Sequence, residues 1–204
     1  MLDCIYLASQ SPRRRELLRQ IHVRFEPLLF CGSHSGDAET DETPLPHEAP
    51  RPYVERLALD KAHTGFRRLR LRHLPVRPVL AADTTLEVDG RIVGKPASHE
   101  EAGTILHRLS GRSHRVLTAI AVTNGKHTAH ATSESTVHFR PLSAGEIRAY
   151  VASGEPMGKA GAYGIQGRAA IFIEKIHGSY SGIMGLPLCE TSLLLREFGV
   201  SVLK

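Results

Sequence analysis

The 204-residue chain contains no tryptophan, and aromatic residues make up only 5% of it. Proteins that bind single-stranded nucleic acids usually place aromatic rings between basic residues as stacking platforms, so this scarcity argues against that class. The three cysteines, Cys4, Cys31 and Cys189, lie far apart and form no Cys-x-x-Cys pair. The sequence therefore indicates neither a disulfide framework nor a zinc site, and its cysteine content fits a reducing compartment.

Long apolar runs are also absent. No stretch approaches the roughly 18 consecutive apolar residues of a membrane span, and no basic segment followed by a long apolar core marks a signal peptide. We therefore expect a cytoplasmic protein that does not bind membranes. Its 41% hydrophobic and 23% charged residues are ordinary for a globular protein, and we expect one domain of two lobes over residues 1–204.

The net charge is positive. Lysine and arginine number 26 against 21 acidic residues, which gives a formal charge of +5. This excess favours an anionic ligand but does not separate a nucleotide from a nucleic acid. A cluster of arginines follows a predicted helix, and we interpret it as the solvated end of that helix rather than a nucleic-acid surface. These arginines are Arg67, Arg68, Arg70 and Arg72.

The most informative stretch follows a short apolar run at residues 5–7, which predicts a strand. Residues 8–15 read Ala-Ser-Gln-Ser-Pro-Arg-Arg-Arg, in which Ser11 suits a helix N-cap and Pro12 the first helical position. The free N–H groups of a helix start attract anions, and arginine donates well to phosphate oxygens. Since arginines are usually disfavoured at a helix start, the stretch favours a polyphosphate site without a glycine-rich loop. The alternative is a solvated, arginine-rich first helical turn. The residues expected to contact the ligand are Ser9, Arg13 and Arg14.

Hydrophobic periodicity and turn signals predict alternating strands and helices. Asp89-Gly90 and Asn124-Gly125 are typical of hairpin turns, and Ser98/Glu101 and Ser143/Glu146 have the spacing of capping boxes. Because the two hairpins interrupt the alternation, we expect an α/β fold with a mixed sheet. The predicted strands cover residues 5–7, 23–29, 79–82 continuing over 85–88, 91–93, 116–123, 132–139 and 171–176. A long loop is predicted over residues 31–50.

Asp83 follows the apolar run 79–82, where a carboxylate has no packing role. A residue at the C-terminal end of a strand usually faces a ligand crevice, so Asp83 can hold a divalent cation or orient an attacking water. The alternative is an ordinary turn residue. Lys61 on a predicted helix and Lys95, which Pro96 holds extended, are common surface lysines when taken singly. Together with the arginines they can surround a triphosphate, whose charge must be offset before water attacks.

Residues 158–167 contain four glycines in ten positions. Such a stretch predicts a tight loop in which the backbone approaches a ligand closely. Gln166 has an amide acceptor and two donors, so it can bind the polar edge of a pyrimidine. The alternative is a glycine-rich turn with a solvated glutamine.

Taken together, these stretches resemble the Maf family of nucleotide pyrophosphatases. The resemblance covers nearly the whole chain in the right order, apart from roughly residues 30–50. After residues 8–18, the matching segments are Ala81-Ala82-Asp83-Thr84, Gly94-Lys95-Pro96, Leu109-Ser110-Gly111 with His114 and Thr118, residues 159–167, Gly178-Ser179-Tyr180 and Gly185-Leu186-Pro187.

The resemblance implies an elongated mixed β-sheet with flanking helices and two lobes around a central cleft. It also implies an enzyme that uses a divalent cation, Mg²⁺ or Mn²⁺, and that attacks the α-phosphorus of a nucleoside triphosphate to release pyrophosphate. Asp83 matches the proton acceptor of the family, and Thr84 matches a position linked to substrate choice. We expect Thr84, Arg13 and Gln166 together to shape that choice. The family further suggests a homodimer.

Two segments refine this expectation. Ser-Pro-Arg-Arg at residues 11–14 and Tyr-Gly-Ile-Gln-Gly at residues 163–167 resemble the subgroup that acts on dTTP and UTP, and the subgroup acting on 7-methyl-GTP differs at both places. The family usually has an acidic pair in a short loop after the second strand. Here residues 31–40 resemble an insertion of unknown role, and the pair matches Asp41-Glu42, which makes Glu42 a second candidate metal ligand.

Two alternatives remain at this point. The same chemistry could act on a modified purine nucleotide such as 7-methyl-GTP. A different class, a non-enzymatic nucleic-acid-binding regulator of cell division, would suit the basic composition. However, a binding module has no use for a carboxylate that faces anions, so the combination of Asp83, Lys95 and Gln166 favours the enzyme.

Overall fold

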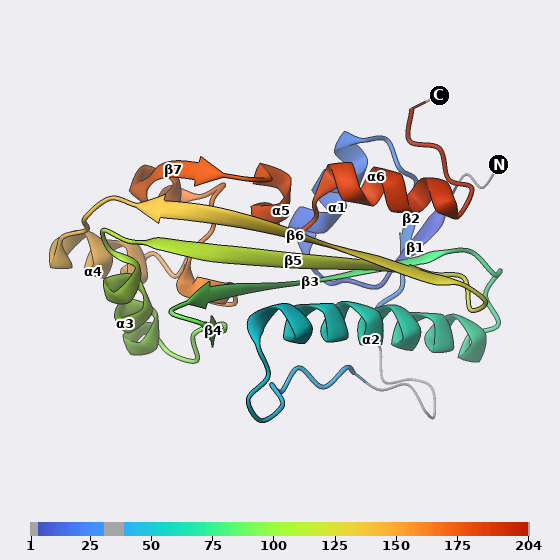
Figure 1. The fold of residues 1–204 in the computed structure, drawn as a ribbon, viewed down its shortest axis with the longest axis horizontal. Helices are drawn as coiled ribbons and strands as arrows, with labels where there is room; N and C mark the ends of the chain where they lie inside the picture. The colour runs from blue at the N-terminus through green and yellow to red at the C-terminus, as the bar shows by residue number, and fades with distance from the viewer. Residues whose placement is uncertain (1–3, 31–38, 204) are drawn as a thin grey trace.

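Seven strands form one mixed sheet in the described part of the chain, residues 4–30 and 39–203 of the computed structural model (Figure 1). Their order is β2-β1-β3-β5-β6-β7, and β4 pairs with the end of β3. Strand β1 is parallel to β2 and β3, and the other pairs are antiparallel. The strands are β1 (Ile5–Leu7), β2 (Phe25–Pro27), β3 (Val79–Val88), β4 (Arg91–Val93), β5 (Ser113–Thr123), β6 (Thr128–Phe139) and β7 (Ile173–His177).

Helices cover both faces of this sheet. Helix α2 (Pro50–Leu71) lies along one face, while α1 (Pro12–Gln20) and α6 (Leu188–Glu197) lie on the other (Figure 1). Helices α3 (His99–Leu109) and α4 (Ala144–Ala152) lie together at the end of the sheet near β4 and β7. The remaining helical segments are α5 (Tyr180–Met184) and the two 3₁₀ turns η1 (Ala160–Ala162) and η2 (Arg168–Phe172). The α/β class and the mixed sheet predicted from the sequence are confirmed.

The two faces are separated by the alternation of side chains along β3 and β5. On the α2 face the sheet presents Ala81, Ala119 and Ala121, all fully buried. These small side chains let the helix approach the strands closely, and its own small residues, Ala58 and Ala62, pack there with them. This close packing carries the side chains of α2 to the middle of β3.

Local turn and cap signals account for most of the boundaries. Asp89 and Gly90 both have positive φ angles, 54° and 75°, as a type I′ hairpin turn requires. Ser143 and Glu146 form the full capping box at α4. At α3 only half of the predicted box is present: Ser98 Oγ accepts from the Glu101 amide at 3.1 Å, but the Glu101 carboxylate accepts from the Ala97 amide at 2.7 Å.

Asp83 does not lie at the end of a strand, as its sequence position suggested. Strand β3 continues through it to Val88, because β5 pairs with β3 residue by residue from Val79 to Glu87. The neighbour on the other side is shorter: β1 ends at Leu7, opposite Leu80. Asp83 therefore lies just beyond the carboxyl end of a parallel strand, where α/β sheets form ligand crevices.

The interpretation of the arginines near residue 70 as a solvated helix end is wrong for Arg68. Its side chain is buried, and Nη1 donates to the Leu28 carbonyl oxygen at 3.3 Å. Helix α2 continues to Leu71 against β3, so this face of its last turns is covered. The predicted insertion at residues 31–40 lies mostly outside the described residues, and residues 39–49 form neither helix nor strand. Among the described helices, none is long and apolar enough to cross a membrane.

Candidate active site

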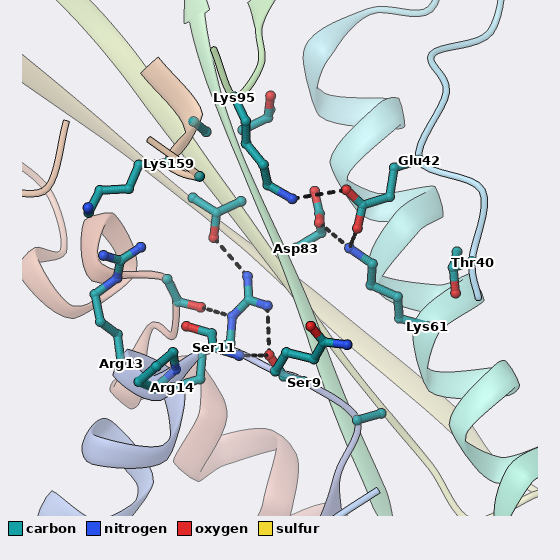
Figure 2. Close-up of a pocket in the computed structure, with 18 of the residues that line it drawn as sticks. Ser9, Ser11, Arg13, Arg14, Thr40, Glu42, Lys61, Asp83, Lys95 and Lys159 are labelled. Carbon is teal, nitrogen blue, oxygen red and sulfur yellow. Dashed lines mark hydrogen bonds and ion pairs between the residues drawn. The ribbon is translucent and has the colours of Figure 1, made fainter. Parts of the chain in front are cut away.

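A cavity of about 740 Å³ opens where β1 ends and β3 continues (Figure 2). Segments far apart in the sequence line it: the start of α1, residues 39–42, α2, β3, the loop after β4 and residues 158–165. The predicted site residues that line the cavity are Ser9, Arg13, Arg14, Glu42, Lys61, Asp83, Thr84 and Lys95. Gln166 is the exception. Its side chain is exposed and does not line the cavity, although Ile165 does, so its role in base reading stays a prediction.

Four charged side chains, which we call the Asp83 cluster, occupy one side of the cavity (Figure 2). Lys61 Nζ lies 2.6 Å from Asp83 Oδ1 and 2.6 Å from Glu42 Oε1. Lys95 Nζ lies 3.2 Å from Glu42 Oε2. Two ammonium groups therefore neutralise two carboxylates, and the cluster as a whole carries no net charge.

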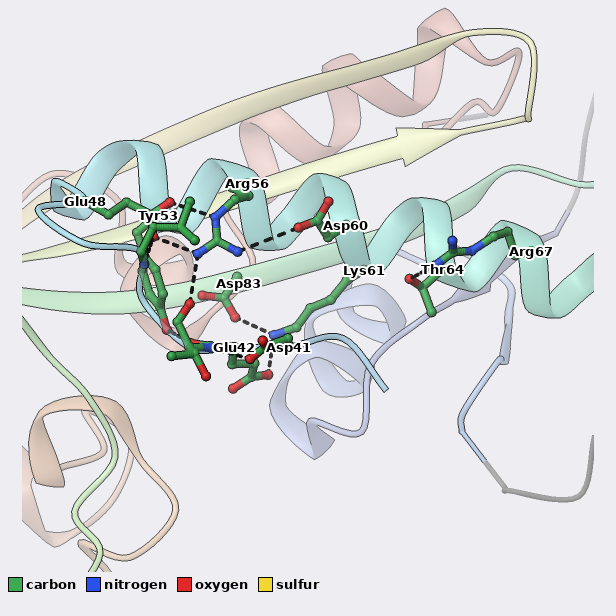
Figure 3. Close-up of polar contacts among 12 residues, drawn as sticks. Asp41, Glu42, Glu48, Tyr53, Arg56, Asp60, Lys61, Thr64, Arg67 and Asp83 are labelled. Atoms are coloured by element: carbon green, nitrogen blue, oxygen red, sulfur yellow. Dashed lines mark hydrogen bonds and ion pairs between the residues drawn. The ribbon is translucent and has the colours of Figure 1, made fainter. Parts of the chain in front are cut away.

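Glu42 reaches this cluster because its segment is fastened to α2 (Figure 3). Tyr53 donates from its hydroxyl to the Glu42 carbonyl oxygen at 2.9 Å, and Arg56 donates to the Thr43 carbonyl oxygen at 3.2 Å. Burial, and then the charges of Asp83 and Glu42, raise the pKa of Tyr53 to about 12, so it remains a donor. Burial of the Glu42 carboxyl opposes its ionisation, but Lys61 and Lys95 outweigh this effect and lower its pKa.

Most N–H donors of the Arg14 guanidinium already bind protein acceptors. Its Nε donates to the Gly185 carbonyl oxygen at 2.8 Å, Nη1 to Ser9 Oγ at 3.1 Å and Nη2 to Thr84 Oγ1 at 3.2 Å. Burial lowers its pKa, and the nearby charge of Asp83 partly offsets that effect. A guanidinium has five N–H donors, so two remain for a ligand. Arg14 thus joins α1, β3 and the end of α5 before any ligand binds.

Arg13 and Lys159, which we call the Lys159 wall, lie on the other side of Arg14 (Figure 2). Among the described residues neither forms an ion pair, and Lys159 Nζ donates to the backbone carbonyl oxygen of Glu155. A methyl group on Gly164 would lie 3.1 Å from Lys159 Cε and 3.8 Å from Arg13 Nη1, so both side chains flank this glycine. No role was predicted for Lys159, although it lies within the glycine-rich stretch at residues 158–167 that the sequence singled out.

A buried pair stands behind this wall. His114 is 3% exposed, and its Nε2 lies 2.8 Å from the hydroxyl of Tyr163, a residue that lines the cavity. Its Nδ1 has no hydrogen-bond partner among the described residues. Burial, and then the charge of His138, lower the pKa of His114 to about 4, so the imidazole is neutral at pH 7.

The donor set of the Asp83 cluster fits a hard divalent cation. No group of three or more His, Cys, Asp or Glu side chains within residues 4–30 and 39–203 could hold a metal ion by itself. Mg²⁺, however, is commonly bound through one or two carboxylates together with substrate phosphates. Asp83 Oδ1 and Glu42 Oε1 already converge on one cationic nitrogen at 2.6 Å each, so they can supply the two carboxylate oxygens of such a site.

The family assignment rests on a match over almost the whole chain. The model of the family described as Maf-like protein matches residues 4–198. The chain belongs to the Maf-like family. A dTTP/UTP pyrophosphatase of Aromatoleum aromaticum is 65% identical over 96% of this chain and 95% of its own length. The dTTP/UTP pyrophosphatase of Dechloromonas aromatica is 55% identical over 96% of this chain and 97% of its own.

Solved structures agree on the fold. A HAM1 protein from Coxiella burnetii superposes with a TM-score of 0.52 at 22% identity, over 96% of this chain and 100% of that one. At this identity the likeness concerns the arrangement of strands and helices alone. It matches the elongated mixed sheet with flanking helices predicted from the sequence.

Proposed function

We propose that this protein is a nucleoside triphosphate pyrophosphatase that hydrolyses dTTP and UTP to the monophosphate and pyrophosphate. Two Maf relatives at 65% and 55% identity carry that name. The observation that carries the proposal is the Asp83 cluster: two carboxylates and two lysines from four separate segments converge on one side of a cavity. Such a group can hold a polyanion together with a divalent cation.

Asp83 is the proposed proton acceptor. Its Oδ1 accepts from Lys61, and among the described residues its Oδ2 has no hydrogen-bond partner. Oδ2 can therefore hold a water molecule and accept its proton as that water attacks the α-phosphorus. Lys61 fixes the rotamer of the carboxylate, since its ammonium lies between Asp83 and Glu42.

Asp83 and Glu42 are the proposed ligands of Mg²⁺ or Mn²⁺. When bound, such a cation offsets the charge of the phosphates and polarises the reacting phosphorus. Lys61 and Lys95 exchange part of their pairing with these carboxylates for phosphate oxygens. The N-terminal end of α1 with Ser9 and Arg14 faces the same cavity, and the two remaining donors of Arg14 can bind a phosphate oxygen.

The finer expectations are proposals as well. Thr84, whose Oγ1 accepts from Arg14 and lies 2.9 Å from Thr118 Oγ1, is placed to influence substrate choice. A cytoplasmic location, a homodimer and the absence of nucleic-acid binding follow from the resemblance and the composition rather than from the site.

A panel of nucleotides tests this function. Pyrophosphate release is measured from dTTP, UTP, CTP, GTP and 7-methyl-GTP, with Mg²⁺ present and absent. We expect the highest kcat/KM for dTTP and UTP and a requirement for the metal. A preference for GTP or 7-methyl-GTP, or release of orthophosphate in place of pyrophosphate, would overturn the proposal.

A further inference from the structure

The two sides of the cavity differ in charge balance. In the Asp83 cluster every ammonium lies within 3.2 Å of a carboxylate oxygen. Arg13 and Lys159 carry two positive charges, and among the described residues no carboxylate lies within ion-pair distance of either side chain. Glu155, whose charge acts on Lys159, uses its carboxylate oxygens for the Tyr150 hydroxyl and the Arg168 amide.

Holding these two cations together has an electrostatic cost. Burial, and then the charge of Arg13, lower the pKa of Lys159, with Glu155 acting weakly in the opposite sense. The backbone accommodates the Lys159 side chain in two ways. The Glu155 carbonyl oxygen accepts a hydrogen bond from the Lys159 ammonium, and Gly164 has no side chain that would displace Lys159. Both side chains are only partly buried, and among the described residues neither has a carboxylate partner, so the wall can donate to the acceptor oxygens of a ligand.

The surroundings of the wall indicate what kind of acceptor. The segment that carries Lys159 lines the cavity with Ala160, Tyr163, Gly164 and Ile165. Apart from the Tyr163 hydroxyl, which already pairs with His114, these are apolar side chains and bare backbone. The two carboxylates proposed to bind the metal belong to the Asp83 cluster. Ligand pockets combine apolar walls with a few polar groups at their edges, and this combination suits a flat heterocycle with acceptor oxygens better than a hydrated polyphosphate.

We infer that Lys159, whose side chain flanks Gly164 beside Arg13, is a specificity-determining residue that donates to a carbonyl oxygen of the uracil or thymine ring. This inference rests on the proposed function and places the base beside Gly164 and the phosphates at the Asp83 cluster. Lys159 offers only donors, so it selects rings whose exposed edge carries acceptors.

This arrangement accounts for discrimination that a neutral amide could not supply. Uracil and thymine present two carbonyl oxygens, whereas cytosine replaces one with an amino donor. When the Lys159 ammonium faces the amino group of cytosine, two donors meet and neither has an acceptor. An unpaired polar group in a binding site is a strong basis for rejecting a substrate. A 7-methylguanine ring carries a positive charge, and two unpaired cations repel it.

The test is the variant Lys159→Met, which keeps the apolar stem and removes the ammonium. Activity on dTTP and UTP is expected to fall by about ten- to a hundredfold in kcat/KM, as for other lost charge-assisted hydrogen bonds, while CTP changes little. Inhibition by free pyrophosphate is measured in parallel and is expected to stay unchanged. Lys126→Gln, at an exposed lysine of the turn between β5 and β6, is the matched control.

Each other outcome decides against the inference. An equal loss on all nucleotides with weakened pyrophosphate inhibition would assign Lys159 to the phosphates, and unchanged selectivity would leave it no role in the base site. Gly164→Ala provides a second variant in case Lys159→Met folds poorly, because it displaces Lys159 without removing its charge; a smaller shift in the same direction is expected. If the parent protein fails to hydrolyse dTTP and UTP, the proposed function fails instead.

Discussion

The Asp83 cluster and the Lys159 wall line one cavity, but they differ in how their charged side chains are paired. In the cluster, Lys61 lies 2.6 Å from both Asp83 and Glu42, so cations and anions are already paired. In the wall, two cations from distant parts of the sequence meet without a carboxylate partner among the described residues. The first arrangement suits a reaction centre that exchanges partners when substrate and metal arrive. The second suits recognition of a ligand that brings acceptors.

A similar contrast separates two neighbouring residues. Arg13 has no hydrogen bond from its side chain to any described residue, whereas Arg14 makes three to protein acceptors. Both come from the same first turn of α1, and the sequence predicted that both contact the phosphates, with a further role in substrate choice for Arg13. The two side chains have the same chemistry and lie in the same helical turn. Their different contacts therefore come from the residues that surround each of them in space.

The largest expected effect is at the reaction centre. Asp83→Asn preserves size and removes the proposed proton acceptor, so kcat for dTTP is expected to fall by about 10²–10⁴-fold. The thermal midpoint is recorded alongside to exclude unfolding. Asp60→Asn, at a half-exposed carboxylate on the same helix as Lys61, should leave the rate unchanged. A parent-like rate for Asp83→Asn would contradict the role of Asp83.

The next effect concerns the neutral imidazole behind the Lys159 wall. Burial lowers the pKa of His114 to about 4 in the folded protein, against an ordinary value of 6.5 for an exposed histidine. Between these pH values the unfolded chain binds more protons than the folded one, so the free energy of unfolding falls as the pH falls. Full stability is present above pH 6.5, and the contribution lost by pH 4 is about 3 kcal/mol.

This prediction is checked with His114→Gln. Denaturant titrations of parent and variant are compared over pH 4 to 7, and only the slopes against pH are used. The variant should have the flatter slope, because its side chain does not titrate. Equal slopes would mean that His114 is not held neutral by burial.

Adjacent arginines should respond in opposite ways. Arg14→Ala leaves three acceptors unpaired, and since hydrogen bonds to charged groups are worth about 1.5–3 kcal/mol each, the free energy of unfolding should fall by at least that amount. Arg13→Ala should change stability by under about 0.5 kcal/mol while lowering kcat/KM. Urea unfolding and steady-state kinetics of both variants check this. Equal free energies of unfolding for the two variants would contradict the structural role given to Arg14.

The smallest effect is expected at Glu42, whose side chain is 44% exposed. Glu42→Gln removes one proposed metal ligand, so the Mg²⁺ concentration for half-maximal activity should rise by about tenfold or more, since even outer-sphere substitutions cost about 10–100-fold in metal affinity. Metal titrations of activity measure it, with Glu100→Gln on α3 as the control. If the Mg²⁺ concentration for half-maximal activity does not change, Glu42 is not a metal ligand.

Features fixed by adjacent residues could be predicted from the sequence. The hairpin turns at Asp89-Gly90 and Asn124-Gly125 and the capping box of Ser143 and Glu146 are present because they depend on local backbone geometry. Strand lengths depend on the partner strand instead. Strand β2 is limited to Phe25–Pro27 by the length of β1, and β6 extends back to Thr128 because β5 pairs with it there.

The site was predictable in composition more than in arrangement. Lys61 was expected at the cavity but not as a bridge between Asp83 and Glu42, since that contact joins residues from α2, β3 and the segment before α2. Lys159 lines the cavity although it was not singled out, and Gln166 does not, because a glycine-rich stretch does not by itself indicate which of its side chains faces a cavity. Arg68 was misjudged because its cover comes from residues near Leu28, far away in the sequence.

The central claim, that water attacks the α-phosphorus beside Asp83, is tested most directly by isotope labelling. Hydrolysis of dTTP is carried out in ¹⁸O-enriched water, and both products are analysed by mass spectrometry. We expect one ¹⁸O atom in thymidine monophosphate and none in pyrophosphate. Label in the pyrophosphate would place the attack on the β-phosphorus and contradict the account.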